Sequence, residues 1–128
     1  MNKEKYYKFM LICAGLYNCI NAVVFIISSI FILEVFPSFG VAVPISMIWL
    51  HLTLIFIIVY GIGYFMVSMN LEKNHGIIVI GAIAKVMFFI MTLIYMFLGD
   101  VNILVVTLGS IDLLFVCLFI EFLLKYEK

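Results

Sequence analysis

The fold is decided by residues 76–124, which read GIIVIGAIAKVMFFIMTLIYMFLGDVNILVVTLGSIDLLFVCLFIEFLL. Two apolar runs flank the dipeptide Gly99-Asp100, and each has about the 20 residues that a helix needs to cross the hydrocarbon core of a bilayer. Glycine suits the end of one helix, and aspartate suits the cap of the next. We therefore predict two membrane-spanning helices, at about residues 76–98 and 101–124, with a tight turn between them.

Two further apolar runs precede this pair, at about residues 7–33 and 44–69. Pro44 suits the first turn of its helix, where the missing N–H of proline costs nothing. The connections between the four segments are too short to hold a separate soluble domain. The sequence therefore predicts an all-α integral membrane protein, in which residues 1–128 form a single antiparallel four-helix transmembrane bundle.

The composition supports the same class. The chain has 128 residues, of which 68% are hydrophobic and 11% are charged, and its mean hydropathy is +1.37. Soluble domains are about half apolar and about a quarter charged, and a domain of this size has too little interior to hide the excess. The lipid bilayer is therefore the expected surrounding. A formal net charge of zero argues against a nucleic-acid partner.

The lysines predict the orientation across the membrane. With four spans, all but one of the lysines fall on the same side: Lys3, Lys5, Lys8, Lys73, Lys125 and Lys128. The opposite side carries Glu34 and Asp100 and no lysine. Since lysine-rich segments stay in the cytoplasm, we expect both termini in the cytoplasm.

Two charged residues, Lys85 and Asp112, lie near the middle of the last two predicted helices. Each costs about 2.5–3.5 kcal/mol to insert at the centre of a bilayer. Counted from the turn, Lys85 lies about two residues deeper than Asp112, which at a rise of about 1.5 Å per residue is a mismatch of about 3 Å. A lysine side chain spans that distance, so we predict a buried ion pair.

Other polar residues recur at helical spacing in the four segments, namely Asn18, Asn21, Tyr60, Tyr64 and Tyr95. Polar residues gather at the interfaces of membrane helices, because lipid provides no hydrophobic drive for helix association. We expect these residues to converge with Lys85 and Asp112 on one polar interior. That interior either holds the helices in register or binds a small molecule, a proton or a lipid head group.

A smaller polar pair, Glu34 and His51, is expected toward the face opposite the termini. If these two side chains pair, the histidine would act as a proton sensor or relay. The alternative is two separate residues at the membrane–water interface. The segment Tyr60-Gly61-Ile62-Gly63-Tyr64 predicts either a close approach of two helix backbones or a local kink.

The sequence contains no recognisable catalytic motif, metal site or cofactor fingerprint. The three cysteines form no Cys-x-x-Cys pair, and the two histidines do not supply the matched pair of ligands that a membrane haem needs. We therefore expect no metal, no cofactor and no catalytic residue.

Several short segments, spread over most of the chain, have the character of one class of small membrane proteins. They are Tyr17-Asn18, Tyr60-Gly61-Ile62-Gly63-Tyr64, Asn74-His75-Gly76, Gly81-Ala82-Ile83-Ala84-Lys85, Gly99-Asp100 and Asp112. With these segments the chain resembles small bacterial membrane proteins of the DoxX-like kind. The resemblance implies a four-helix bundle in a bacterial inner membrane that works as a partner of redox or stress-response systems. It brings no catalytic residues with it.

Three functions fit these features. The first is a non-enzymatic protein that binds a small amphipathic ligand or is an accessory of a membrane protein partner. The second is an oligomeric, proton-coupled small-molecule transporter, although small multidrug exporters have a glutamate in their first helix, where this chain has Asn18 and Asn21. The third is a membrane enzyme acting on a lipid or a quinone, whose only candidate residues are Lys85, Asp112, Tyr60 and Tyr64. We expect the first function and leave the oligomeric state open.

Overall fold

The computed structural model describes residues 2–126, which form five α-helices and no strand. The helices are α1 (Lys3–Phe31), α2 (Val35–Ser38), α3 (Ile48–Met69), α4 (His75–Leu98) and α5 (Ile103–Lys125). All except α2 are long and apolar enough to cross a membrane. The prediction of an all-α chain with four helices that can span a membrane is confirmed. Lys128, one of the lysines used to predict orientation, lies outside the described residues.

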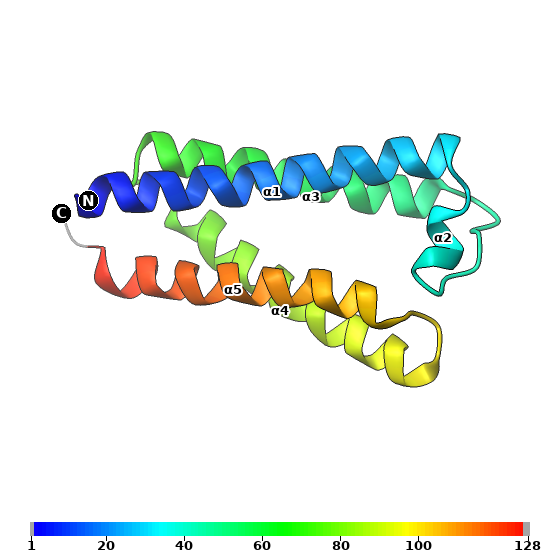
Figure 1. The fold of residues 1–128 in the computed structure, drawn as a ribbon. Helices are drawn as coiled ribbons and strands as arrows, with labels where there is room; N and C mark the ends of the chain where they lie inside the picture. The colour runs from blue at the N-terminus through cyan, green and yellow to red at the C-terminus, as the bar shows by residue number, and fades with distance from the viewer. Residues whose placement is uncertain (1, 127–128) are drawn as a thin grey trace.

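The four long helices are arranged as two pairs, with α1 packed along α3 and α4 packed along α5 (Figure 1). The beginning of α1 and the end of α5 lie at the same end of the molecule, where Lys3 Nζ donates a hydrogen bond to Lys125 O. We call this the terminal end, and we call the opposite end, which carries α2, the α2 end. Helix α4 starts close to α3 near the terminal end and diverges from it toward the α2 end (Figure 1).

Two glycines bring the backbones of α1 and α3 into contact. A Cβ atom on Gly61 would lie 3.0 Å from Gly15 O and 2.7 Å from Cys19 Sγ, and a Cβ atom on Gly15 would lie 2.9 Å from Gly61 O. Such small residues let membrane helices approach closely and gain dispersion contacts. The close backbone approach predicted for the segment around Gly61 is therefore confirmed.

The turn between α4 and α5 differs from its prediction in one respect. Gly99 ends α4 as expected, with a φ of 87° in the left-handed region that glycine tolerates. Asp100, however, is not the cap of α5, because its N–H donates to Tyr95 O and so completes the end of α4. The cap of α5 is Asn102, whose Oδ1 accepts a hydrogen bond from Leu104 N at 3.0 Å.

The connection between α1 and α3 is longer than predicted, and the prediction that Pro44 starts a helix is wrong. Helix α3 begins at Ile48, and the segment before it crosses over to α5. There Asn102 N donates to Phe39 O at 2.9 Å, and Asn102 Nδ2 donates to Ser38 O at 2.7 Å. After a turn at Gly40, whose φ is 72°, the chain returns from α5 to the axis of α3 through residues 41–47, which are not helical.

The buried core lies in the terminal half of the bundle. We call it the core cluster, and its members are Tyr7, Met10, Leu11, Ala14, Tyr64, Val67, Leu71, Ile78, Phe119 and Phe122. Six rings of this region pack edge to face or tilted against one another, namely those of Tyr7, Tyr64, His75, Phe119, Phe122 and Tyr126. The outward faces of the long helices are apolar, as lipid contact requires.

Candidate functional site

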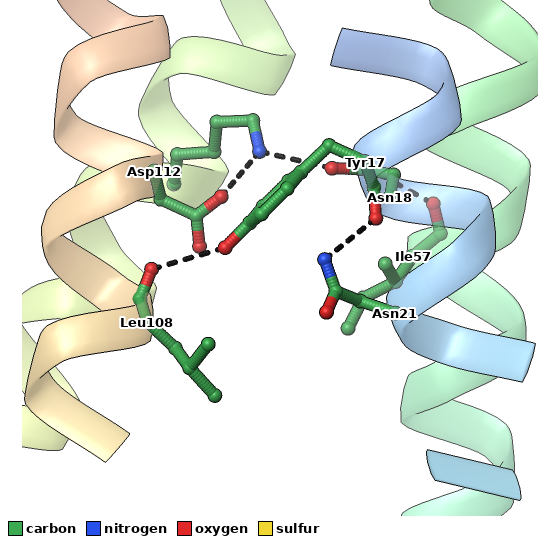
Figure 2. A network of polar contacts seen from close by, with 7 residues as sticks. Tyr17, Asn18, Asn21, Ile57, Leu108 and Asp112 are labelled. Atoms are coloured by element: carbon green, nitrogen blue, oxygen red, sulfur yellow. Dashed lines mark hydrogen bonds and ion pairs between the residues drawn. The ribbon is translucent and has the colours of Figure 1, made fainter. Parts of the chain in front are cut away.

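The centre of the bundle contains an ion pair between α4 and α5. Lys85 Nζ lies 2.5 Å from Asp112 Oδ1, and it also donates a hydrogen bond to Asn18 Oδ1 at 3.0 Å. Lys85 is only 6% exposed, so it is buried within the bundle. The predicted Lys85–Asp112 ion pair is confirmed. Through Asn18 it reaches α1 and links the two helix pairs (Figure 2).

Asn18 and Asn21 both belong to the polar network, but they have different roles (Figure 2). Asn18 Nδ2 donates to Ile57 O at 3.3 Å, so this one side chain connects α1 with α3 and α4. Asn21 Nδ2 donates to Tyr17 O at 2.8 Å within α1. Asn18 therefore connects three helices, whereas the hydrogen bond of Asn21 stays within α1.

Three aromatic rings surround the ammonium of Lys85. Its Nζ lies 5.6 Å from the ring centres of Tyr17 and Phe115 and 5.9 Å from that of Tyr64. Ring faces attract a cation and partly replace its lost hydration. The Tyr17 hydroxyl donates to Leu108 O at 3.2 Å, which holds α1 against α5 (Figure 2).

Tyr17 and Phe115 were not predicted as site residues. Both lie at helical spacing from residues that were predicted. Tyr17 lies four residues before Asn21, and Phe115 lies three residues after Asp112, so each shares a helix face with a predicted site residue. Aromatic residues are so common in this chain that the spacing alone did not distinguish them.

The three tyrosines expected in the polar interior do not all reach it. Tyr64 is 1% exposed and packs on Gly81 and on the ring of Phe119. Tyr60 is half-buried. Tyr95 is 44% exposed, and the expectation that it joins the others is wrong. It lies ten residues beyond Lys85, about 15 Å along α4, where α4 has already diverged from the rest of the bundle.

Glu34 and His51 are not brought together. His51 Nε2 lies 2.9 Å from Ser29 Oγ, an interaction that links α3 to α1. Glu34 is exposed and precedes α2, where its backbone oxygen accepts a hydrogen bond from Ser38 Oγ at 2.9 Å. Because α1 ends at Phe31, the chain turns into α2 before Glu34 can face His51. Of the two alternatives, the structure has two separate polar residues.

A cavity of about 450 Å³ lies between the two helix pairs and extends from the ion pair to α2. Its polar lining is confined to a few side chains: Tyr17, Asn18, Asn21, Thr53, Tyr60, Tyr64, Lys85 and Asp112. The remaining walls are apolar and include Phe25, Leu54, Ile57, Val105 and Leu108. Ligand pockets of about 300–1,000 Å³ with apolar walls and a few convergent polar groups are typical of small-molecule sites.

Helix α2 closes one end of this cavity. Phe36 and Phe39 belong to the lining, and Phe36 is buried. The two hydrogen bonds from Asn102 hold this segment on the start of α5. On the terminal side the core cluster fills the interior. The cavity is therefore bounded along the bundle axis at both ends.

The polar lining of the cavity consists of one ion pair and several neutral groups. Within residues 2–126, no three His, Cys, Asp or Glu side chains lie close enough to hold a metal ion. Lys85 and Asp112 neutralise each other, and the other polar lining groups are amides and hydroxyls. These groups can donate and accept hydrogen bonds.

Comparisons with protein-family models, with curated proteins and with solved structures each found no match. The resemblance to DoxX-like proteins therefore stays a prediction.

Proposed function

We propose that this protein is a non-enzymatic integral membrane protein that binds a small amphipathic molecule in the cavity beside Lys85 and Asp112. One observation carries the proposal: the cavity has the size of a ligand site, and most of its hydrogen-bonding groups lie around Lys85 and Asp112, whereas its other walls are mainly apolar. A bundle that needed its polar residues for registration alone would pack tightly around them, as the core cluster does. The protein acts by itself or as an accessory of a larger membrane system.

The placement in the membrane is part of the same proposal. The four long helices form an antiparallel bundle, with the terminal end in the cytoplasm and the α2 end on the opposite side of the inner membrane. The distribution of lysines supports this orientation, because Lys3, Lys5, Lys8 and Lys125 lie at the terminal end. The resemblance to DoxX-like bacterial membrane proteins fits the same placement.

Photolabelling tests the proposal. The full chain in lipid nanodiscs is irradiated with a trifluoromethyl-phenyldiazirine, a neutral apolar photolabel, and the labelled residues are mapped by mass spectrometry. We expect a saturable fraction on cavity-lining residues such as Leu54 and Leu108, above the non-saturable labelling of the lipid-facing surface. Labelling that is non-saturable throughout would refute binding in the cavity.

Two matched variants give the control. Ala84→Phe adds a phenyl ring to the cavity wall, whereas Ile83→Phe adds one to the exposed face one residue away. We expect the saturable fraction to disappear in Ala84→Phe and to persist in Ile83→Phe. Equal behaviour of the two variants would place the labelled site outside the cavity.

A further inference from the structure

The polar end of the cavity has hydrogen-bond donors that the protein does not use. The ammonium of Lys85 has three N–H groups and donates to Asp112 and Asn18, which leaves one. Tyr60 and Tyr64 line the cavity, and neither hydroxyl forms a hydrogen bond with another group among residues 2–126. Tyr64 is almost fully buried, yet it belongs to the cavity lining.

These donors indicate which functional group the polar end of a ligand, called its head below, must carry. A donor at the edge of an apolar cavity is stabilised when it gains an acceptor, so a ligand oxygen that accepts from Tyr60, Tyr64 or Lys85 is favoured over a group that cannot accept. The head must also be neutral. Lys85 and Asp112 already cancel each other, and a charged head would leave an unpaired charge between apolar walls.

The position of the donors also predicts how the ligand lies. Lys85 is ten residues from the start of α4 and thirteen from its end, so the head is held near the middle of the membrane. The apolar part of the cavity extends from there toward α2. A phospholipid keeps its head at the membrane surface, so it has the opposite arrangement and does not fit this site.

The route into the cavity runs through the side of the bundle. Near the terminal end α3 and α4 are in contact, with Gly63 against Ile77 and Gly81 against Tyr64. Farther along the two helices diverge (Figure 1). The cavity lining includes Phe56 of α3 and Phe88 of α4, which are 64% and 41% exposed, so the lining reaches the surface on both of these helices. Since the core cluster and α2 close the two ends, this gap faces lipid.

We propose that the cavity takes a neutral, lipid-soluble molecule with a hydrogen-bond-accepting oxygen at its head, such as a ketone, and that this molecule enters sideways from the bilayer between α3 and α4. The inference rests on the proposed function, because it assigns the ligand class and the entry route of the same cavity. It commits to no particular metabolite.

A head-group series tests the ligand class. Saturable photolabelling of the full chain in nanodiscs is displaced with 2-tetradecanone, tetradecane, tetradecylammonium or myristate, each compared at the same mole fraction in the lipid. We expect the ketone to displace the label at about tenfold lower mole fraction than the hydrocarbon, the ratio that corresponds to about 1.4 kcal/mol from its hydrogen bonds. The two charged competitors should be no better than the hydrocarbon.

The double variant Tyr60→Phe and Tyr64→Phe identifies the donors. It keeps both rings and removes two hydroxyls that no other side chain uses, so the fold should be unaffected. We expect the advantage of the ketone to fall at least threefold, whereas saturable labelling itself persists. The matched control is Tyr95→Phe, which removes a hydroxyl outside the cavity and should leave the advantage unchanged.

A bridge across the gap tests the route. In a chain whose three native cysteines are replaced by alanine, Phe56→Cys and Phe88→Cys are joined by a bis-maleimide. We expect displacement by 2-tetradecanone to slow at least tenfold. The same pair capped with N-methylmaleimide should exchange at the rate of the unmodified chain.

The outcomes separate the two proposals. If no labelling is saturable in any variant, the proposed function fails and the ligand class fails with it. If labelling is saturable but a charged competitor or the hydrocarbon matches the ketone, the cavity binds ligands and the ligand class proposed here is wrong. If the bridged and capped chains exchange at the same rate, entry between α3 and α4 is wrong.

Discussion

The terminal half and the α2 half of the bundle have the same helices but different interiors. In the terminal half, side chains such as Tyr7, Leu11 and Phe122 are completely buried in the core cluster. In the α2 half the helices surround a cavity of about 450 Å³, and hydrogen bonds such as that between His51 and Ser29 hold its outer parts. The comparison shows that the two interiors differ in kind. The terminal half supplies most of the buried packing, and the α2 half encloses the cavity.

The ion pair of Lys85 and Asp112 lies at the boundary between the halves, and substitutions there should lower the free energy of unfolding most. Asp112→Leu leaves the ammonium of Lys85 without its counter-charge in a buried site. We expect a loss of about 3–5 kcal/mol in the free energy of unfolding, because an unpaired buried charge is far worse than none. Reversible unfolding in bicelles by steric trapping measures this loss.

The matched control is the double variant Lys85→Met and Asp112→Leu, which removes both charges together. We expect it to recover most of the stability that the single variant loses. If the double variant is as unstable as Asp112→Leu, the cost comes from lost packing and not from the unpaired charge.

Truncation of one leucine in each half compares the two interiors directly. Leu11→Ala opens a hole in the core cluster, and we expect a loss of about 2 kcal/mol in the free energy of unfolding. Leu54 is also buried but lines the cavity, so its truncation only enlarges an existing space and should cost less than half as much. The same unfolding assay compares them, and equal losses would mean that the two halves are packed alike.

The glycine contact between α1 and α3 should tolerate no added methyl group. Gly61→Ala places its Cβ against Cys19 Sγ and Gly15 O, which forces the helices apart and should cost about 1–2 kcal/mol. Gly76→Ala serves as the control, since its Cβ would meet nothing within 4 Å. A stable Gly61→Ala variant would show that the two helices separate without penalty.

Asn102 should have a small effect on stability and the clearest effect on α2. Asn102→Ala removes the cap of α5 and should cost about 1 kcal/mol. Asn102→Asp keeps the capping oxygen but loses the Nδ2 donor to Ser38 O, so stability should hold while amide hydrogen exchange in α2 accelerates. Unchanged exchange in Asn102→Asp would show that this donor does not hold α2.

Counting along helices predicted the ion pair because Lys85 and Asp112 lie on helices joined by a short turn. Their depth then depends only on the rise per residue and the position of the turn. The same counting failed for Tyr95, since it contains no information about the angle at which α4 leaves α3. The cavity depends on that angle as well, so the sequence indicated a polar interior without indicating a space beside it.

The segment between α1 and α3 was mispredicted for a related reason. Proline at position 44 has a high local preference for a first helical turn, and nothing nearby in the sequence opposes it. The deciding contact comes from Asn102, more than fifty residues away, which holds Ser38 and Phe39 against α5. Local preference gives way where a distant hydrogen bond fixes the path of the chain.

The ion pair also bears on how the chain is made. Lys85 leaves the ribosome 27 residues before Asp112, an interval of about 1–5 s at ordinary rates of synthesis. During that interval α4 carries an unmatched charge and is poorly suited to enter lipid alone. We therefore expect α4 to stay beside the translocon until α5 emerges, so that both helices enter the bilayer together as a neutral unit. That unit then joins α1 and α3, whose Asn18 is already in place to receive the lysine.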